Sequence, residues 1–364
     1  MKNTEYVLKR INRLRKKFLD KGIDALFVSA PVNVSYLSGF SGDDSYLFIT
    51  YNDVYFITDP RYEEQIQEEI PESFNKIIFF KEREKRLIEF LGDQDIKILG
   101  IEDRRITYHM YERLKGELRK KKIVPTGEIV EELRLVKDEY EISLIKSAID
   151  VSLRAMDETI REITPGISEK EVSAKFAYLL RIYGAEKESF DTIVASGPRG
   201  ALPHGVASSR IIGREDMIVL DFGVKKRGYD SDTTRTIKIG RPTSIEKEVY
   251  EIVKEAKDRA ILSVKPGIST KELDKVARDY IMSKGYGRYF GHGLGHGVGM
   301  EIHEAPYISS TYDVRLCPGM VITIEPGIYL PGKFGVRIED MVLVTDRGGE
   351  VLTKKMKTDL NYIS

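Results

Sequence analysis

The second half of the chain contains an internal repeat, and this repeat constrains the fold more than any other feature. The tetrapeptide Pro-Gly-Ile-Ser begins at Pro165 and recurs at Pro266, 101 residues later. An acidic helical turn follows in both copies, so Ser168 and Ser269 are expected to cap the N-termini of two equivalent helices. A duplicated unit of this kind predicts an α+β domain whose two halves are related by a pseudo-twofold axis.

Two apolar segments in this region end in acidic residues. Residues 217–221 end at Asp221, and residues 321–325 end at Glu325. A second acid follows each segment, Asp232 in the first copy and Glu339 in the second. Carboxylates at the ends of buried strands are costly unless cations compensate their charge. The repeat would bring the two acid pairs together about its axis, so we expect one compensated cluster.

Four of the five histidines of the chain occur near these acids: His204, His292, His296 and His303. His292 and His296 belong to residues 290–299, a segment with five glycines that allow a close approach of the backbone to a metal. The alternative is a flexible loop with surface histidines. Four carboxylates and one imidazole suit a pair of divalent ions about 3.5–4 Å apart.

Four sequence blocks resemble those of the metallopeptidases that contain aminopeptidase P and prolidase: LDFG-x7-SDTTRT, GHGLGHGVGMEIHE, GMVITIEPGIY and GVRIEDMVLVT. The resemblance implies a C-terminal "pita-bread" catalytic domain with a dinuclear metal site that acts on Xaa-Pro bonds. Its ligand positions fall on Asp221, Asp232, His296, Glu325 and Glu339. We expect two divalent ions per subunit, with Mn²⁺ the first choice because oxygen donors dominate, and Co²⁺ or Zn²⁺ as alternatives.

The resemblance also assigns catalytic roles. His204 and His303 correspond to substrate-binding and proton-handling histidines, and the alternative for His204 is a turn residue after proline. Glu325 is the expected proton-accepting base. Arg337 is two residues before Glu339 and shares its face of a strand, so it should support a ligand carboxylate. His292 is expected to contact the substrate or to support the metal ligands. A packing role would give the same sequence pattern.

The first part of the chain alternates between helical and strand-like patterns, which predicts an α/β domain over residues 1–128. The expected helices cover 1–22, 60–69, 83–91 and 108–120, and the expected strands cover 25–28, 46–49, 54–57, 77–80 and 96–101. One long helix is expected over 129–160. It would lead into the pita-bread domain, which we expect to span residues 129–364.

The substrate prediction is a peptide with proline at its second position. Many prolidases carry an arginine shortly after the His-Glu-x-Pro motif, but none occurs here between Pro306 and Arg315. This departure favours an Xaa-Pro aminopeptidase that accepts longer peptides, with an Xaa-Pro dipeptidase (prolidase) as the alternative. A non-catalytic pita-bread module that binds peptides is a more remote alternative.

Composition and charge limit the other partners. Lys plus Arg and Asp plus Glu both total 58, which gives no reason to expect nucleic acid or a membrane. The single cysteine, Cys317, and the lack of an apolar leader predict a cytoplasmic protein. The family's dimers predict a homodimer, in which residues 38–44 are the candidate loop near the partner's active site.

Overall fold

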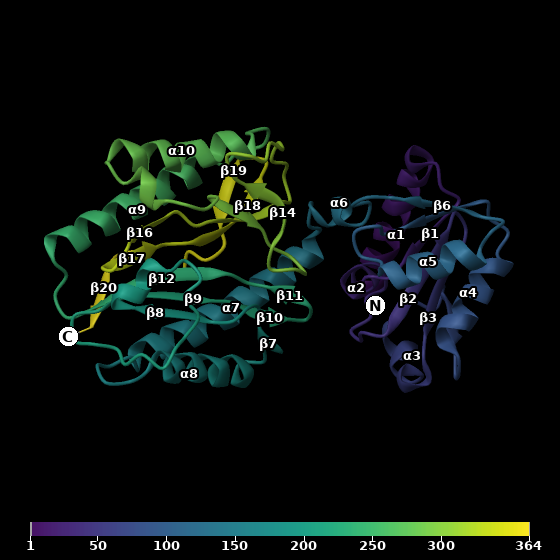
Figure 1. Ribbon diagram of the computed structural model, residues 1–364, viewed down its shortest axis with the longest axis horizontal. Coiled ribbons are helices and arrows are strands. Elements are labelled where there is room, and N and C mark those ends of the chain that lie inside the picture. The colour runs from purple at the N-terminus through teal and green to yellow at the C-terminus, as the bar shows by residue number, and fades with distance from the viewer. Residues whose placement is uncertain (1, 364) are drawn as a thin grey trace. The chain divides into compact units, whose positions relative to one another are not determined.

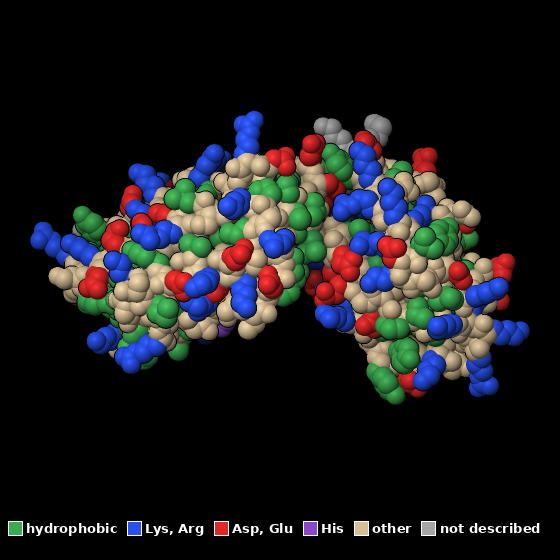
Figure 2. All heavy atoms as spheres, turned by 90° about the horizontal axis from the view of Figure 1, so that it is seen from above, with side chains coloured by type: hydrophobic (Ala, Val, Ile, Leu, Met, Phe, Trp, Pro, Cys, Tyr) green, Lys and Arg blue, Asp and Glu red, His purple; other side chains and the backbone are tan. Residues whose placement is uncertain are grey.

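The computed structural model describes residues 2–363 and forms two compact units, which divide between Arg134 and Leu135 (Figure 1). The division falls a few residues after the boundary expected at residue 128. Basic and acidic side chains are interspersed on the face shown in Figure 2. Among residues 2–363 there is no helix that combines the length and the apolar character needed to span a membrane.

The N-terminal unit contains a mixed six-stranded sheet in the order β4-β3-β2-β1-β5-β6. Its strands are β1 (Ala25–Val28), β2 (Ser45–Thr50), β3 (Val54–Thr58), β4 (Asn75–Ile78), β5 (Ile98–Ile101) and β6 (Lys122–Pro125). Its helices are α1 (Lys2–Lys21), α2 (Pro31–Ser38), α3 (Gln65–Glu69), α4 (Arg83–Asp93), α5 (Tyr108–Glu117) and α6 (Glu131–Arg134), with a 3₁₀ turn η1 at Pro60–Tyr62. Leu87 and Leu91 of α4 and Leu114 of α5 pack in one apolar cluster with strand residues such as Phe27 and Phe48.

Three details of this region differ from the prediction. Helix α2 and strand β6 were not expected, and the predicted helix over 60–69 is split into η1 and α3. The long helix predicted over 129–160 is confirmed only from Glu139 onward, because the chain breaks between α6 and α7 (Glu139–Arg161). Asp138 caps α7 by accepting a hydrogen bond from the Glu141 amide, and Glu141 accepts one from the Asp138 amide. This capping box starts a new helix where hydrophobic periodicity alone suggests a continuous one.

The C-terminal unit shows the predicted repeat in its helices. Helices α7 and α8 (Glu169–Ile182) correspond to α9 (Ser244–Ser263) and α10 (Thr270–Ser283). Ser168 and Ser269 are the N-caps of α8 and α10, each within a capping box. Gly184 and Gly285, just beyond the ends of these helices, share a φ of 84°, a left-handed conformation that favours glycine.

The strands of this unit form sheets in both halves. The first half contains β7 (Lys187–Glu188), β8 (Ile193–Ser196), β9 (Met217–Phe222), β10 (Val224–Lys226), β11 (Tyr229–Asp230) and β12 (Thr233–Ile239), with η2 at Gly197–Ala201. The second contains η3 (Gly287–Tyr289), β13 (Gly295–Gly297), β14 (Glu304–Ile308), β15 (Val321–Ile324), β16 (Gly327–Leu330), β17 (Phe334–Arg337), β18 (Asp340–Thr345), β19 (Gly348–Val351) and β20 (Asn361–Ile363). The main sheets have the orders β20-β12-β9-β8 and β14-β13-β15-β18-β19, and smaller sheets are β11-β10-β7 and β16-β17.

The two helix pairs enclose the sheets of the C-terminal unit. In Figure 1, α9 and α10 lie along one side of the strands and α7 and α8 along the other. Apolar residues of α7 and α8 pack with β8, β9 and β12, where Phe176 stacks on Phe222 at 4.3 Å between ring centroids. Residues of α9 and α10 pack with β15, β17 and β18. Each half therefore has its own core, and polar side chains gather where the sheets of the two halves approach.

Candidate active site

All nine site residues predicted from the sequence line one cavity of about 610 Å³. The first half of the repeat contributes Asp221 from β9 and Asp232 from the turn before β12. The second half contributes His296 from β13, Glu325 after β15, and Glu339 between β17 and β18. Acids that are distant in the sequence thus come together, as the repeat predicts.

Backbone hydrogen bonds fix the positions of these residues. Strand pairing places Thr234 of β12 opposite Asp221 of β9. The Glu339 amide donates to the Thr234 carbonyl at 3.1 Å, which joins the second half of the repeat to the first. In the second half, the Glu325 amide donates to the Leu294 carbonyl at 2.8 Å. The candidate metal ligands therefore lie in strands or directly next to strand ends.

Three of the five candidate ligands form a tight buried group. One donor atom from each of Asp232, His296 and Glu339 lies within 4.8 Å of the other two. His296 Nε2 is 3.6 Å from Asp232 Oδ2 and 3.4 Å from Glu325 Oε1. His296 Nδ1 lies 3.1 Å from the Gly297 carbonyl oxygen, which fixes the proton on Nδ1 and leaves Nε2 facing the carboxylates.

Two buried carboxylate oxygens of the cluster have no hydrogen-bond partner among the described residues: Asp221 Oδ1 and Glu339 Oε1. A buried charged oxygen without a donor is costly, and coordination to a cation removes that cost. Together with the neighbouring oxygens and one imidazole nitrogen, these atoms fit divalent metal ions that prefer oxygen ligands.

The pKa values of the cluster report the same crowding of negative charge. Burial, followed by repulsion from neighbouring carboxylates, raises the pKa of Asp232 and of Glu339 well above the usual range. Burial raises the pKa of Glu325 to about 7. Burial lowers the pKa of His296 to about 3, so its imidazole is neutral at physiological pH and available as a ligand.

Arg337 hydrogen-bonds to a candidate ligand, and its hydrogen bonds connect both halves. Its Nη2 donates to Asp221 Oδ2 at 2.7 Å, and its Nε donates to the Thr234 hydroxyl at 3.1 Å. The Thr234 hydroxyl in turn donates to Glu339 Oε2 at 2.7 Å. Thr234 thereby acts as a bridge between Arg337 and a candidate ligand, a role that its β-propensity alone could not reveal.

Tyr329 of β16 is a site residue that the sequence reasoning missed. Its hydroxyl accepts a hydrogen bond from Arg337 Nη1 at 2.9 Å and lies 3.0 Å from His292 Nε2. His292 Nδ1 lies 2.7 Å from the Gly293 carbonyl oxygen, so Nε2 is the acceptor from Tyr329. Burial, followed by the nearby Arg337 cation, lowers the pKa of His292 to about 4. His292 therefore takes part in a fixed chain of hydrogen bonds next to the ligands.

His303 and His204 line the same cavity without belonging to the compact ligand group. The His303 ring lies 4.4 Å from the His296 ring, centroid to centroid. Burial, followed by the neighbouring His204, lowers the pKa of His303. A neutral imidazole at this position can donate a hydrogen bond to a bound substrate.

The rest of the cavity wall is aromatic, hydroxylic and acidic, and was not predicted. It includes Phe190, Asp191, Tyr307, Ser309, Thr311 and Tyr312. Tyr307 and Tyr312 meet edge to face with ring centroids 5.6 Å apart. Among the described residues that line the cavity, Arg337 is the only arginine or lysine.

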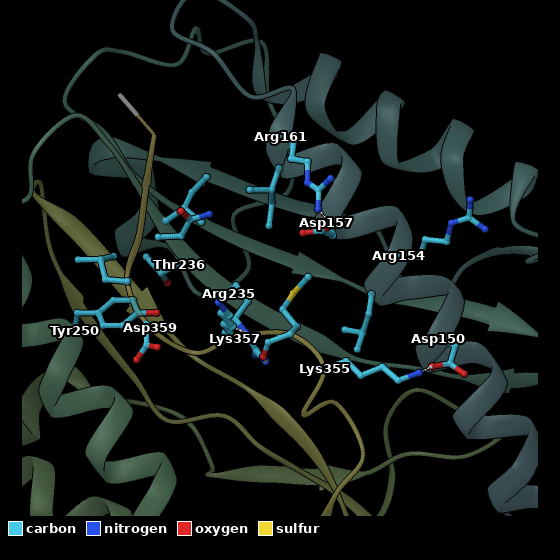
Figure 3. A pocket seen from close by; sticks show the side chains of 16 residues that line it. Asp150, Arg154, Asp157, Arg161, Arg235, Thr236, Tyr250, Lys355, Lys357 and Asp359 are labelled. Carbon is cyan, nitrogen blue, oxygen red and sulfur yellow. Dashed lines mark hydrogen bonds and ion pairs between the residues drawn. The ribbon is translucent and has the colours of Figure 1, made fainter.

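A larger cavity of about 880 Å³ lies between α7 and the C-terminal segment, as Figure 3 shows. Two ion pairs lie within its lining, between Lys355 and Asp150 at 2.7 Å and between Arg161 and Asp157. None of the nine predicted site residues lines it. The chemistry that the sequence predicts therefore belongs to the smaller cavity.

Comparisons with known proteins agree with this architecture. Residues 143–346 match the model of metallopeptidase family M24, and residues 10–136 match the creatinase/prolidase N-terminal domain. The chain is 44% identical to the Xaa-Pro dipeptidase of Pyrococcus furiosus, an alignment that covers 95% of this chain and 97% of that protein.

Two solved structures show the same fold. The Xaa-Pro dipeptidase from Bacillus anthracis has a TM-score of 0.95 at 41% identity, covering 98% of this chain and 100% of that one. The X-Pro aminopeptidase from Thermotoga maritima has a TM-score of 0.89 at 42% identity, covering 94% and 98%. The expected α/β domain and pita-bread domain with its internal repeat are thus confirmed. The chain belongs to metallopeptidase family M24, with a creatinase/prolidase N-terminal domain before its catalytic unit.

Proposed function

We propose that this protein is a metal-dependent exopeptidase that hydrolyses Xaa-Pro bonds, with Xaa-Pro dipeptides as its substrates. The observation that carries the proposal is the convergence of Asp221, Asp232, His296, Glu325 and Glu339 on one cavity that also contains His303. The missing arginine after Pro306 favours an Xaa-Pro aminopeptidase, but the curated relatives with a named activity support the dipeptidase alternative better. A complete ligand set also argues against a non-catalytic peptide-binding module.

The five ligand residues would hold two divalent ions, and Mn²⁺ is the first candidate because four of the five are carboxylates. When bound, such ions supply Lewis-acid polarisation of the scissile carbonyl and an activated water. Arg337 orients Asp221 directly and Glu339 through Thr234. These contacts use one oxygen of each carboxylate. The other oxygens, Asp221 Oδ1 and Glu339 Oε1, have no hydrogen-bond partner among the described residues and remain available to a metal ion.

The remaining residues handle protons and substrate. Neutral His303 donates a hydrogen bond to the carbonyl oxygen of the first residue as negative charge develops on it. Glu325 accepts a proton from the attacking water. His204 faces the same cavity, and we assign it to substrate binding and proton transfer toward the proline nitrogen. The free α-amino group of the substrate contacts Asp232.

A second candidate function is the Xaa-Pro aminopeptidase expected from the sequence. One observation favours it. The outer cavity wall contains Asp191, Tyr307 and Tyr312, while the single cationic lining residue, Arg337, is buried and hydrogen-bonded. A dipeptide places its own carboxylate close to the scissile bond, where this wall offers no free cation. A longer peptide carries a neutral amide at that position.

One experiment tests both candidates. The protein is stripped of metal, reloaded with Mn²⁺, and assayed on Ala-Pro, Ala-Pro-Ala and Ala-Ala-Ala with chromatographic product analysis. Cleavage of Ala-Pro with a kcat/KM above that of Ala-Pro-Ala supports the dipeptidase, and the reverse order supports the aminopeptidase. Equal cleavage of Ala-Ala-Ala, or full activity in metal-free protein verified by elemental analysis, would contradict the proposal.

A further inference from the structure

A buried ion pair connects the start of the catalytic unit to the segment that carries His303. Lys137 Nζ lies 2.7 Å from Glu304 Oε1, with 0% and 9% of the two side chains exposed. Lys137 follows closely on Leu135, where the C-terminal unit begins, and its amide donates to the Gly319 carbonyl at 2.9 Å. This pair is outside the cavity, so it can act on the reaction only through its neighbours.

Glu304 directly follows His303 and begins β14. Its carboxylate packs against the glycine-rich segment so closely that a Cβ on Gly299 would lie 2.3 Å from Glu304 Oε1. A Cβ on Gly297 would lie 2.3 Å from the Ala305 carbonyl oxygen. The segment of residues 297–303, which joins His296 to His303, therefore packs closely against Glu304 and Ala305. Lys137 pairs with the first of these two residues.

A second, partly buried contact holds the middle of the same segment. Lys225 Nζ donates to the Met300 carbonyl at 2.8 Å and pairs with buried Asp230 at 2.6 Å. The Asp230 amide donates to the Gly299 carbonyl at 2.8 Å. Two lysines from different parts of the catalytic unit therefore fix this short segment. Lys225 contacts it at Met300, and Lys137 pairs with Glu304, the residue that directly follows it.

We propose that Lys137 and Lys225 are positioning residues, which fix the 297–303 segment and so hold His303 at its distance from His296. The effect on catalysis rests on the proposed function, whereas the effect on the segment does not. Buried ion pairs contribute little net stability, because desolvation of the two charges offsets most of their attraction. A segment with two glycines, Gly297 and Gly299, has many accessible conformations, and two fixed contacts select one of them.

The test compares a single and a double variant of the Lys137–Glu304 pair. Lys137→Met removes the cation beside the buried Glu304 carboxylate, and Glu304→Gln in the same chain then removes the charge of that carboxylate. Lys146→Met is the matched control, because Lys146 forms an exposed pair with Glu350 at 3.0 Å. Each Mn²⁺-loaded variant is measured for Tm, metal content, kcat and KM, and for hydrogen exchange of residues 297–303.

The double variant separates positioning from stability. We expect it to recover the Tm that Lys137→Met loses and to keep its metal. Its kcat should remain about 10–100-fold below the wild-type value with KM little changed, because small misplacements of a catalytic group have effects of this size. Hydrogen exchange of residues 297–303 should be faster than in the wild type and in Lys146→Met.

Recovery of both Tm and kcat in the double variant would overturn the proposal, as would unchanged exchange of residues 297–303. If the Lys137 variants do not fold, Lys225→Met provides the second measurement, with faster exchange centred on Met300 as the expected result and unchanged exchange as the contrary one. If the wild-type protein cleaves no Xaa-Pro peptide, the proposed function fails, but the exchange measurement still tests the role of the lysines.

Discussion

Arg337 Nη2 lies 2.7 Å from Asp221 Oδ2, and this contact joins the two halves of the repeat at the candidate metal centre. Arg337 belongs to the second half and Asp221 to the first, and both side chains are nearly inaccessible to solvent. Burial lowers the pKa of an arginine, but Tyr329, Asp221 and Glu325 outweigh that effect and raise the pKa of Arg337. The guanidinium therefore stays charged and places a cation beside the Asp221 carboxylate.

Replacement of Arg337 should weaken metal binding without removing a ligand. We expect Arg337→Met to lower Mn²⁺ affinity about 10–100-fold, the usual effect of losing a group that orients a ligand. Arg337→Lys should not restore it, because an ammonium group cannot contact Asp221, Thr234 and Tyr329 at once. Calorimetric titration measures the affinities, with the exposed Arg259→Met as control. Wild-type affinity in Arg337→Met would contradict the assigned role.

Replacement of His303 should reduce kcat, whereas replacement of Glu339 should reduce metal affinity. His303→Ala is expected to fold and retain metal but to lose about 10²–10³ in kcat, the usual effect of removing one donor to a developing oxyanion. Glu339→Ala should instead lose metal affinity, because Glu339 Oε1 is one of the unpaired oxygens of the cluster. Elemental analysis and initial rates on one substrate separate the two outcomes. Identical metal content and identical rates in the two variants would refute this division of roles.

Metal affinity should rise with pH up to neutrality. In the metal-free protein the pKa of Glu325 is about 7, and those of Asp232 and Glu339 are also raised, mainly by burial. These carboxyls must lose protons to coordinate a cation, so protons compete with the metal below pH 7 and binding releases them. Titrations at pH 6 in buffers of different ionisation enthalpy should show this release, and it should shrink by pH 8. A pH-independent affinity between 6 and 8 would rule out the coupling.

A buried cluster of charges next to Glu339 should matter for stability. Asp340 Oδ1 pairs with Arg235 Nη2 at 2.8 Å, and Asp340 Oδ2 pairs with Lys257. Asp340→Asn leaves two buried cations with less compensation, so the free energy of unfolding should fall by about 3–5 kcal/mol. Denaturant unfolding of metal-free protein measures it. Asp359→Asn is the control, because Asp359 pairs with Lys254 at the surface and should change little.

The homodimer prediction can be tested with a better variant than a loop deletion. Phe40 is fully buried against Phe56 and Tyr62, so removal of residues 40–44 would damage the core rather than only shorten a loop. Asp43 is exposed, and Asp43→Ala should leave folding and metal content intact. We expect a dimer by light scattering and a changed ratio of Ala-Pro to Ala-Pro-Ala cleavage in this variant. A fully active monomer, or an unchanged ratio, would count against the prediction.

The repeat and the acids were predictable because they have local signatures. A capping serine before an acidic turn and an apolar segment that ends in an acid each identify an element and the position of its functional side chain. Ser168, Ser269, Asp221 and Glu325 were therefore placed correctly. The strand pairing then brings together residues that the sequence separates.

Side-chain partners across the fold were not predictable. Tyr329 has no local feature that distinguishes it from an ordinary buried strand residue, and its role depends on Arg337 returning beside it in the β16–β17 hairpin. The break before α7 was predictable in principle, since Asp138 and Glu141 have the spacing of a capping box, but the long apolar periodicity concealed it. The Lys137–Glu304 pair joins residues far apart in the sequence, and only the structure reveals it.

Because the candidate ligands come from both halves of the repeat, metal binding should affect local opening between the halves. Neither half supplies all five candidate ligands, so a bound metal would cross-link the two halves and oppose their separation. Opening of this seam in the native state should therefore be slower with metal bound than without it. Hydrogen exchange of the strand edges follows such openings, long before global unfolding begins.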